Sequence, residues 1–369
     1  MGWIRNWFSS RKHAVSKLAS PKEGASLSSQ DTLAAIAELS GAVRNNPDAV
    51  EIYLALGNLF RSQGEIERAI HIRNTLIARP RLAPQLKSRA LYELGLDYKR
   101  GGFYDRAQNA LAQARKIVGD DPAILTEMAR LVAESGHYEQ AARYYSLLEK
   151  PLQEAHFQTL LAQEAWRKGE RSASRKWLNK ALRVYPASVE AWLEKAIHAY
   201  DHGYWKELGD ICRQALDYIE SGLGFVLLEG LLRHAHPDTD LPPLFPQEMA
   251  DHILPVLEDQ AQPDLLLYYY GGRLAQGTGD VATARTWYEK SLLLEPQFWP
   301  ARLELLALSR TDQDLTADFE TQLRYLLERA WHVKRFVCGQ CGLKRESHFF
   351  VCPRCQSWHS ITFRTTLNE

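Results

Sequence analysis

The sequence predicts an all-α helical solenoid that is followed, at its C-terminal end, by a small metal-folded domain. Three observations support this fold class. A glycine followed five residues later by a small or apolar residue recurs along the chain, and four cysteines form two close pairs near the C-terminus. The hydrophobic content of 45% is that of an ordinary globular protein. A chain of 369 residues is also long enough to stack several helical units around a continuous core.

Charge is balanced overall but unevenly distributed. The chain carries 45 Lys and Arg against 45 Asp and Glu. Residues 1–22 hold five bases and no acid, residues 332–369 hold six bases and two acids, and the body at 23–331 is therefore acidic. An acidic body repels phosphate, so we expect no nucleic-acid partner. Five cysteines in this length are too few for a disulfide scaffold.

The N-terminal segment, residues 1–22, predicts a basic amphipathic helix. Trp3, Trp7 and Leu18 would share one face of it, with basic residues over much of the remainder. No apolar run here is long enough to span a bilayer or to form a signal-peptide core. The segment either lies on lipid headgroups as a peripheral contact or docks its aromatic side chains on the body. Residues 23–30 follow as a small, polar linker.

Repeated units predict the solenoid over residues 31–333. The pairs that carry the repeat are Gly64 and Ala69, Gly102 and Ala107, Gly136 and Ala141, Gly169 and Ser174, Gly203 and Leu208, and Gly279 and Ala284. A small residue also stands seven positions before each of these glycines. This is the tetratricopeptide pattern, a 34-residue helix–turn–helix. The earlier small residue lets the second helix pack closely, the glycine ends the first helix in a left-handed conformation, and the last residue begins the buried face of the second helix.

The units are not equally regular along the chain. Residues 31–47 predict the second helix of an incomplete first unit, 216–263 are degenerate, and 314–333 predict a terminal helix. A loop at 236–246 is expected to break the array, which resumes at residue 264. Because no unit buries its apolar face alone, stability should come from stacking. We therefore expect most aromatic side chains, Tyr98, Tyr145 and Trp192 among them, to lie in the core.

The first helix of each tetratricopeptide unit lines the concave face of the stack. Counting within the units places a group of mostly basic side chains there, which we call the concave-face set. Its members are Asn58, Arg61, Lys99, Arg100, Arg130, Trp166 and Arg167. Such a group could bind a protein segment that is acidic or ends in a carboxylate. The alternative is that these are solvated surface charges.

Four cysteines predict a metal site in residues 334–369. Cys338 and Cys341 form one C-x2-C pair and Cys352 and Cys355 form another, ten residues further on. Four thiolates at this spacing can surround one metal ion tetrahedrally. This segment is too short to be stabilised by a hydrophobic core alone. We therefore expect metal binding to supply folding free energy on the order of 10 kcal/mol or more. Two nearby histidines are not needed, because the cysteines already complete the coordination shell.

The sequences of the two C-x2-C pairs, which we call knuckles, indicate which metal they bind and what the metal does. Their C-x2-C-G and C-P-x-C forms resemble a rubredoxin, in which iron carries an electron, but the segment between them is shorter and Gln356 stands where glycine is expected. We therefore expect one structural Zn²⁺, with iron as the alternative. A closed four-thiolate site leaves no position for a water. The sequence also contains no nucleophile elbow, phosphate loop, HExxH or paired-carboxylate motif, so we expect no enzyme.

The order of the parts resembles the lipopolysaccharide assembly protein B family, which has tetratricopeptide repeats followed by a rubredoxin-type domain. Residues 57–70, 94–107 and 336–358 carry the most specific matches. The resemblance implies a non-enzymatic adaptor on the cytoplasmic side of the inner membrane, with the four cysteines as metal ligands. It also implies binding to envelope-assembly proteins, and FtsH-dependent proteolysis of the deacetylase that commits precursor to lipid A.

One departure from the family concerns the membrane anchor. The family has an N-terminal transmembrane helix, and we expect none in this sequence. The basic leader would replace it, or the protein would be cytoplasmic and meet the membrane through its partners. Two other functions stay open at this stage. They are a general tetratricopeptide scaffold in another envelope or secretion assembly, and an iron redox protein of rubredoxin type.

Overall fold

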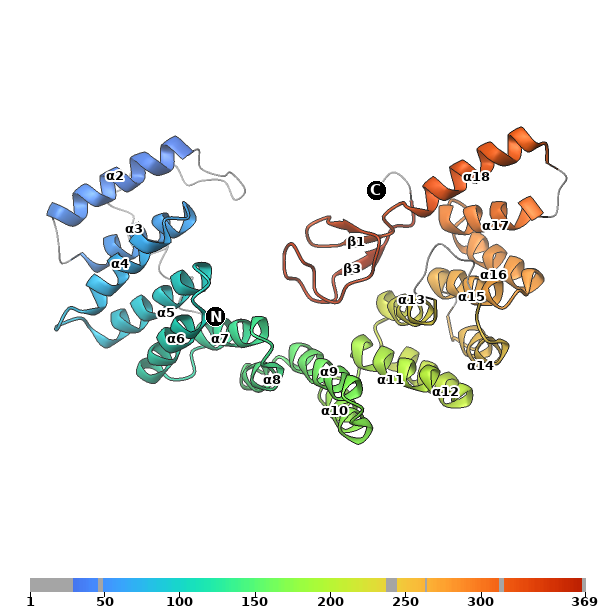
Figure 1. Ribbon diagram of the computed structural model, residues 1–369, viewed down its shortest axis with the longest axis horizontal. Coiled ribbons are helices and arrows are strands. Elements are labelled where there is room, and N and C mark those ends of the chain that lie inside the picture. The colour runs from blue at the N-terminus through green and yellow to red at the C-terminus, as the bar shows by residue number, and fades with distance from the viewer. Residues whose placement is uncertain (1–28, 46–48, 237–243, 263, 312–314, 367–369) are drawn as a thin grey trace. The chain divides into compact units, whose positions relative to one another are not determined.

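The computed structural model describes residues 29–45, 49–236, 244–262, 264–311 and 315–366 (Figure 1). The predicted amphipathic segment at 1–22 and most of the linker at 23–30 lie outside these residues. The described chain forms two compact units that meet in sequence between Glu127 and Met128. Both units are helical, as the repeat pattern predicts. Within the described residues, no helix is long and apolar enough to cross a membrane.

The first unit stacks its helices in antiparallel pairs. Its elements are α2 (Ser29–Asn45), α3 (Val50–Ser62), α4 (Ile66–Ile77), α5 (Pro84–Arg100) and α6 (Tyr104–Val118). The next helix, α7 (Pro122–Glu134), spans the boundary between the units. Each helix from α2 to α5 packs on the next one along the chain, so the apolar faces are buried by neighbours in sequence.

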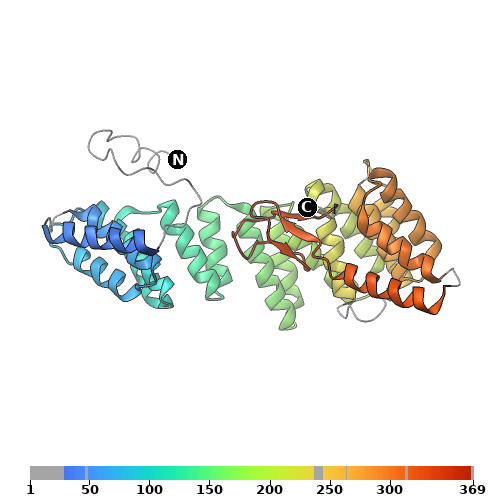
Figure 2. The same ribbon diagram turned by 90° about the horizontal axis from the view of Figure 1, so that it is seen from above.

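The second unit continues the same pattern and ends in a small sheet (Figure 2). Its helices are α8 (Tyr138–Leu147), α9 (Pro151–Arg167), α10 (Arg171–Val184), α11 (Val189–Asp201), α12 (Trp205–Tyr218), α13 (Gly224–Ala235), α14 (Gln247–Glu258), α15 (Leu265–Gly277), α16 (Val281–Leu294), α17 (Trp299–Thr311) and α18 (Ala317–Trp331). A short 3₁₀ turn, η1 (Ser221–Leu223), precedes α13. The strands are β1 (Phe336–Cys338), β2 (Lys344–Arg345) and β3 (Ile361–Phe363).

The residues of the repeat signal do what the pattern requires. All six signal glycines have positive φ, between 67° and 85°, and end a first helix. Ala69, Ala107, Ala141 and Ala284 are fully buried on the second helices. The earlier small residue is needed for close packing, since a Cβ on Gly95 would lie 2.8 Å from Cγ of Leu111. The tetratricopeptide prediction is therefore confirmed at the level of backbone and packing.

In the degenerate stretch, residues 216–263, the described helices continue the stack, although we expected a loop to break it. Helices α13 and α14 pack in series between α11–α12 and α15–α16, so the stack continues through this region. Gly230 on α13 allows close packing on α11, because a Cβ there would collide with Leu193. The loop that was expected to interrupt the array lies mostly in 237–243, outside the described residues. The spacing of the repeat is lost here, and α13 and α14 pack on the flanking helices: α13 on α11 and α15, and α14 on α12 and α15.

Aromatic side chains are mostly core residues, as expected. Tyr145 and Trp192 are 5% and 4% exposed, whereas Tyr98 is half-buried. Cys212 is fully buried on α12, and burial raises the pKa of its thiol to about 12. This thiol is therefore a small packing residue and not a reactive one.

The three-stranded sheet is antiparallel, in the order β2-β1-β3. Phe336 lies opposite Arg345 on one side and Phe363 on the other. Phe336, Phe363 and Ile361 are buried, and they belong to the same hydrophobic cluster as helices α11 to α17. The sheet is thus built onto the helical core of the second unit (Figure 1).

Candidate metal centre and its docking surface

The two cysteine knuckles are matched turns. In the first, the N–H of Cys338 donates to the carbonyl of Leu343 at 2.9 Å. In the second, the N–H of Cys352 donates to the carbonyl of Ser357, also at 2.9 Å. Gly342 and Gln356 hold equivalent positions after each second cysteine, with φ of 69° and 59°. Gln356 therefore adopts the left-handed backbone although it has a side chain.

The four sulfur atoms are arranged for one metal ion. All four Sγ atoms lie within 4.8 Å of one another. The Cys338–Cys355 and Cys341–Cys352 distances are 3.7 and 3.6 Å. A tetrahedral ion with metal–sulfur bonds of about 2.3 Å requires sulfur–sulfur separations of about 3.8 Å. The donor set and its geometry therefore fit a four-thiolate metal site.

Hydrogen bonds around the sulfurs favour thiolates. The Ser357 hydroxyl lies 3.0 Å from Sγ of Cys355, and the Ser360 hydroxyl lies 3.3 Å from Sγ of Cys338. Although burial raises the pKa of Cys338, hydrogen bonds from these two serines lower it to about 5. Oriented hydroxyls of this kind hold metal ligands in place and offset their charge.

A bound cation would favour ionisation of the cysteines. The backbone of Leu343 lowers the pKa of Cys341, but burial and the three other cysteines raise it to about 12. A positive charge placed among the sulfurs would oppose this increase. When bound, the metal would neutralise the charge of the thiolates and cross-link the two knuckles. No histidine joins the cluster of metal-ligating groups in the described chain.

His359 instead links the sheet domain, by which we mean the C-terminal residues 334–366 with the three strands and the cysteines, to the helices. Its Nε2 lies 2.9 Å from Oε2 of Glu190, and Nδ1 of His156 lies 3.1 Å from the other oxygen. Glu190 stands in the first turn of α11, where Ser188 caps the helix, and its side chain is 4% exposed. Burial raises the pKa of Glu190, but the two histidines outweigh this effect and lower it to about 2. The carboxylate is therefore ionised and shared by α9 and the sheet domain.

Aromatic side chains complete this contact. The Trp358 ring packs edge-on to His156 at 4.9 Å, and it also meets Tyr145 and Phe157. On β3, Phe363 packs against Phe225 on α13, at a ring distance of 5.8 Å. The sheet domain thus contacts α8, α9 and α13 of the second unit.

Polar contacts near the ends of the domain add to these. Arg335 donates to the Tyr269 hydroxyl at 2.7 Å, and the indole N–H of Trp299 donates to the carbonyl of Arg364 at 3.2 Å. Sequence reasoning missed the docking residues Glu190 and His156. No spacing rule points to them, because Glu190 is separated from His359 by 169 residues.

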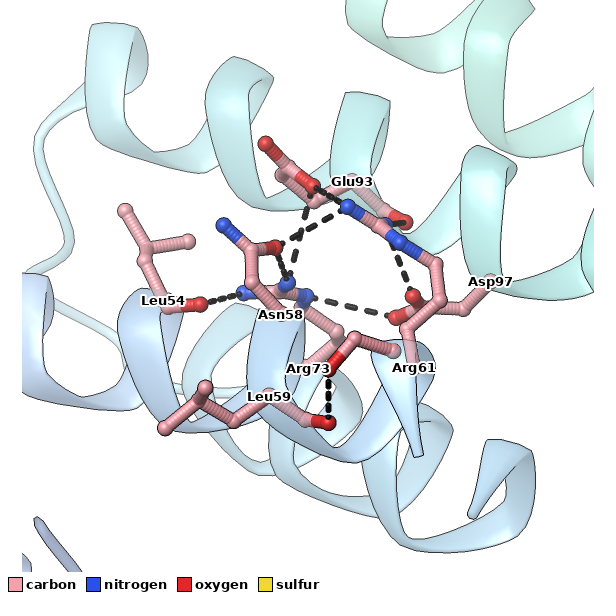
Figure 3. Close-up of polar contacts among 8 residues, drawn as sticks. Leu54, Asn58, Leu59, Arg61, Arg73, Glu93 and Asp97 are labelled. Carbon is pink, nitrogen blue, oxygen red and sulfur yellow. Dashed lines mark hydrogen bonds and ion pairs between the residues drawn. The ribbon is translucent and has the colours of Figure 1, made fainter. Parts of the chain in front are cut away.

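The concave-face set is divided between the two units. In the first unit, Arg61 donates to Glu93 and to Asp97, at 2.8 Å each (Figure 3). Asn58 accepts from Arg61 at 3.1 Å and also from Arg73. Arg73, which was not predicted, is fully buried and pairs with Asp97 (Figure 3). Two arginines and two carboxylates thus form one hydrogen-bonded network, and the charge of Arg61 is already compensated within it.

The other members differ in exposure. Lys99 lies 3.7 Å from Glu127, whereas Arg100 and Arg167 are exposed, and so is Arg130. Trp166 stacks on His198 at 3.4 Å and carries the guanidinium of Arg171 over its ring at 3.5 Å. Its ring is therefore occupied by two intramolecular stacking contacts. Arg100 is the member most open to a partner in the first unit.

Comparison with known proteins agrees with the repeats. Tetratricopeptide-repeat family models match residues 102–164 in one case, and 26–80 and 159–217 in another. A solved structure of a tetratricopeptide repeat protein from Parabacteroides merdae is 20% identical and covers 70% of this chain and 98% of that chain. Its TM-score is 0.36, which is too low to support more than the family models do.

Two curated relatives are both called lipopolysaccharide assembly protein B. The one from Haemophilus influenzae is 24% identical over 327 residues, which are 84% of this chain and 78% of that protein. The one from Escherichia coli K12 is 32% identical over 99 residues, which are 27% of this chain. The match spans about a quarter, 25%, of the Escherichia coli protein. These relatives confirm the family resemblance drawn from the sequence.

Proposed function

We propose that this chain, a tetratricopeptide-repeat homologue of lipopolysaccharide assembly protein B, is a non-enzymatic adaptor that regulates lipopolysaccharide synthesis. The observation that supports an adaptor most strongly is the combination of stacked repeats with a metal site closed by four thiolates. Stacked helical repeats provide extended surfaces for proteins. A closed coordination shell cross-links a fold and activates no water.

The partners are those that the family resemblance implies. We propose that the chain presents the lipid A deacetylase to an FtsH-type membrane protease at the cytoplasmic face of the inner membrane. Other envelope-assembly proteins would bind the remaining repeat surface. Under this proposal, the docked sheet domain keeps the second unit rigid while a partner is held.

Deletion of the gene tests the pathway. If the adaptor speeds proteolysis of the deacetylase, deletion of its gene should lengthen the deacetylase half-life and raise the deacetylase level. Replacing Cys338 and Cys352 by serine should do the same, because the sheet domain loses its metal. Cys212→Ala is the matched control, since it removes a thiol outside the metal site. An unchanged deacetylase half-life in the deletion strain would refute this pathway, leaving a general scaffold role.

The metal is proposed to be zinc. Zinc fits a structural role because the four-thiolate shell is closed and the domain is packed on the helical core. Elemental analysis of the purified full chain should give one zinc per chain and a colourless protein. A red protein with one iron per chain would instead support rubredoxin-type electron transfer.

The concave-face set is proposed as a partner surface. Arg100 is exposed, so Arg100→Glu should weaken capture of the deacetylase. Arg61→Glu should weaken capture less, once its effect on the stability of the fold is taken into account. The reason is that Arg61 already has two carboxylate partners. Co-purification from detergent-solubilised membranes measures this. Undiminished capture by an Arg61, Lys99 and Arg100 triple variant would exclude this surface.

A further inference from the structure

We infer that a groove between α4, α5 and α6 of the first unit binds an extended peptide segment that carries a carboxylate side chain. The groove has a volume of about 330 Å³. That volume is at the lower end of the range of ligand pockets, about 300–1,000 Å³. None of its lining residues belongs to the concave-face set or to the metal centre. The inference therefore goes beyond the proposed function.

The floor of the groove is apolar and the rim is polar. Ile77 from α4 and Leu91 and Leu94 from α5 are among the apolar lining side chains. Leu91 and Leu94 are 3% and 5% exposed, so the floor is firmly packed. A floor of this kind accepts an apolar side chain of a ligand, and polar groups at the rim fix its orientation.

Amide side chains supply the rim. Asn74 comes from α4, while Asn109 and Gln113 are one turn apart on α6. Within the described chain, none of these three side chains makes a hydrogen bond to another residue. Each amide offers both a donor and an acceptor, which is what the N–H and C=O groups of a peptide main chain require.

Arg106 gives the groove its charge. It is the one charged side chain among the lining residues. Its guanidinium lies 5.6 Å from the Phe103 ring centre, and that ring packs edge-on to Tyr98 at 6.3 Å. The arginine is thus oriented by an aromatic pair, and it has no acidic partner within the groove lining. A guanidinium in this position favours a carboxylate, with which it can form two parallel hydrogen bonds.

The length of the rim selects a peptide over a small anion. From Arg106 to Gln113 the rim follows seven residues of α6, which is about 10 Å at 1.5 Å per residue. An extended peptide rises about 3.3 Å per residue, so about three residues fill this length. A free carboxylate would contact Arg106 and leave the amides of Asn109 and Gln113 without a ligand.

An array of immobilised pentapeptides tests the inference with the metal-loaded full chain. The central residue is Glu or Gln, and the flanking residues vary among apolar side chains. We expect the best-bound Glu peptides to bind at least tenfold more tightly than their Gln counterparts. Arg106→Glu should abolish that preference, and Asn109→Ala should weaken the same peptides several-fold. Thermal unfolding of each variant, unchanged within about 2 °C, shows that the fold is kept.

Lys116→Glu is the matched control. It makes the same charge change on an exposed residue of the same helix, outside the groove lining. We expect it to preserve the preference for Glu peptides. Equal losses in Arg106→Glu and Lys116→Glu would overturn the inference, because long-range charge alone would then explain binding. Absence of any preference for Glu, or binding of N-acetylglutamate amide as tight as that of the peptides, would also overturn it.

Discussion

Glu190→Gln tests how the sheet domain is held on the helices. The substitution keeps the side chain's shape but replaces one carboxylate oxygen with an amide NH₂. That group then faces a nitrogen of His156 or His359, which lie 3.1 and 2.9 Å from the two oxygens of the native carboxylate. One hydrogen bond to a buried charged group is lost, and such bonds contribute about 1.5–3 kcal/mol.

The expected effect is a larger undocked population. A loss of about 2 kcal/mol corresponds to about a 30-fold shift in the docking equilibrium, at 1.36 kcal/mol per factor of ten. His359 is a direct reporter of this shift, because its side chain is only 8% exposed when the domain is docked. Its carbethoxylation by diethyl pyrocarbonate should therefore require undocking, and mass spectrometry follows the modification rate.

Glu194→Gln is the control for this experiment. Glu194 lies one turn further along α11, is also buried and also pairs with a histidine, His198, at 3.0 Å. It makes no hydrogen bond or ion pair to the sheet domain among the described residues. The modification rate of His359 should rise about 30-fold in Glu190→Gln, and stay close to wild type in Glu194→Gln. An unchanged His359 rate in Glu190→Gln, or an equal rise in both variants, would refute the docking role.

Three further changes test other parts of the structure. Asp97→Ala should lower the free energy of unfolding by about 3–5 kcal/mol in urea titrations, because it removes the fully buried, nearer carboxylate partner of the buried Arg73 guanidinium and leaves only the more distant Glu93, at 3.6 Å. Gln356→Gly should tighten metal binding about fivefold in chelator competition, since it removes about 1 kcal/mol of left-handed backbone strain. Phe363→Ala should destabilise the second unit by about 3–5 kcal/mol in calorimetry, because it empties a ring site in the shared core.

Two variants serve as controls for these changes. Glu93→Ala removes a carboxylate that is 14% exposed and leaves Asp97 paired with both arginines, so its cost should be clearly smaller than that of Asp97→Ala. Gly342→Ala adds a side chain at the equivalent left-handed turn and should weaken metal binding. Equal costs in the first comparison, or the same sign in Gly342→Ala and Gln356→Gly, would contradict the reasoning.

The repeat architecture was predictable because it is local. Gly64 and Ala69, like the other signal pairs, act within one helix–turn–helix, and sequence spacing fixes their geometry. The four cysteines were predictable for the same reason, since each knuckle is a short turn and metal coordination requires only four close sulfurs. Sequence spacing could not show that α13 and α14 continue the stack, because packing there depends on Gly230 meeting Leu193 in a different helix.

The charges were harder to interpret from the sequence. Position within the unit placed Arg61 on a first helix, but its partners Glu93 and Asp97 come from α5, more than 30 residues away. The pairing converts a predicted free cation into part of a compensated network that also holds the buried Arg73. Spacing alone gives the helix face of a residue, whereas its charge partners depend on which helices pack together.

The helical repeats, the close approach of the four cysteines and the family resemblance could all be predicted from the sequence, because short segments with fixed spacing carry them. The place of the sheet domain could not be predicted in this way and became visible in the folded chain. Its docking depends on His359 meeting Glu190 and on Phe363 joining the core of α11 to α17. Contacts between residues so far apart are selected by burial and charge pairing in the folded chain. No local pattern in the sequence records them.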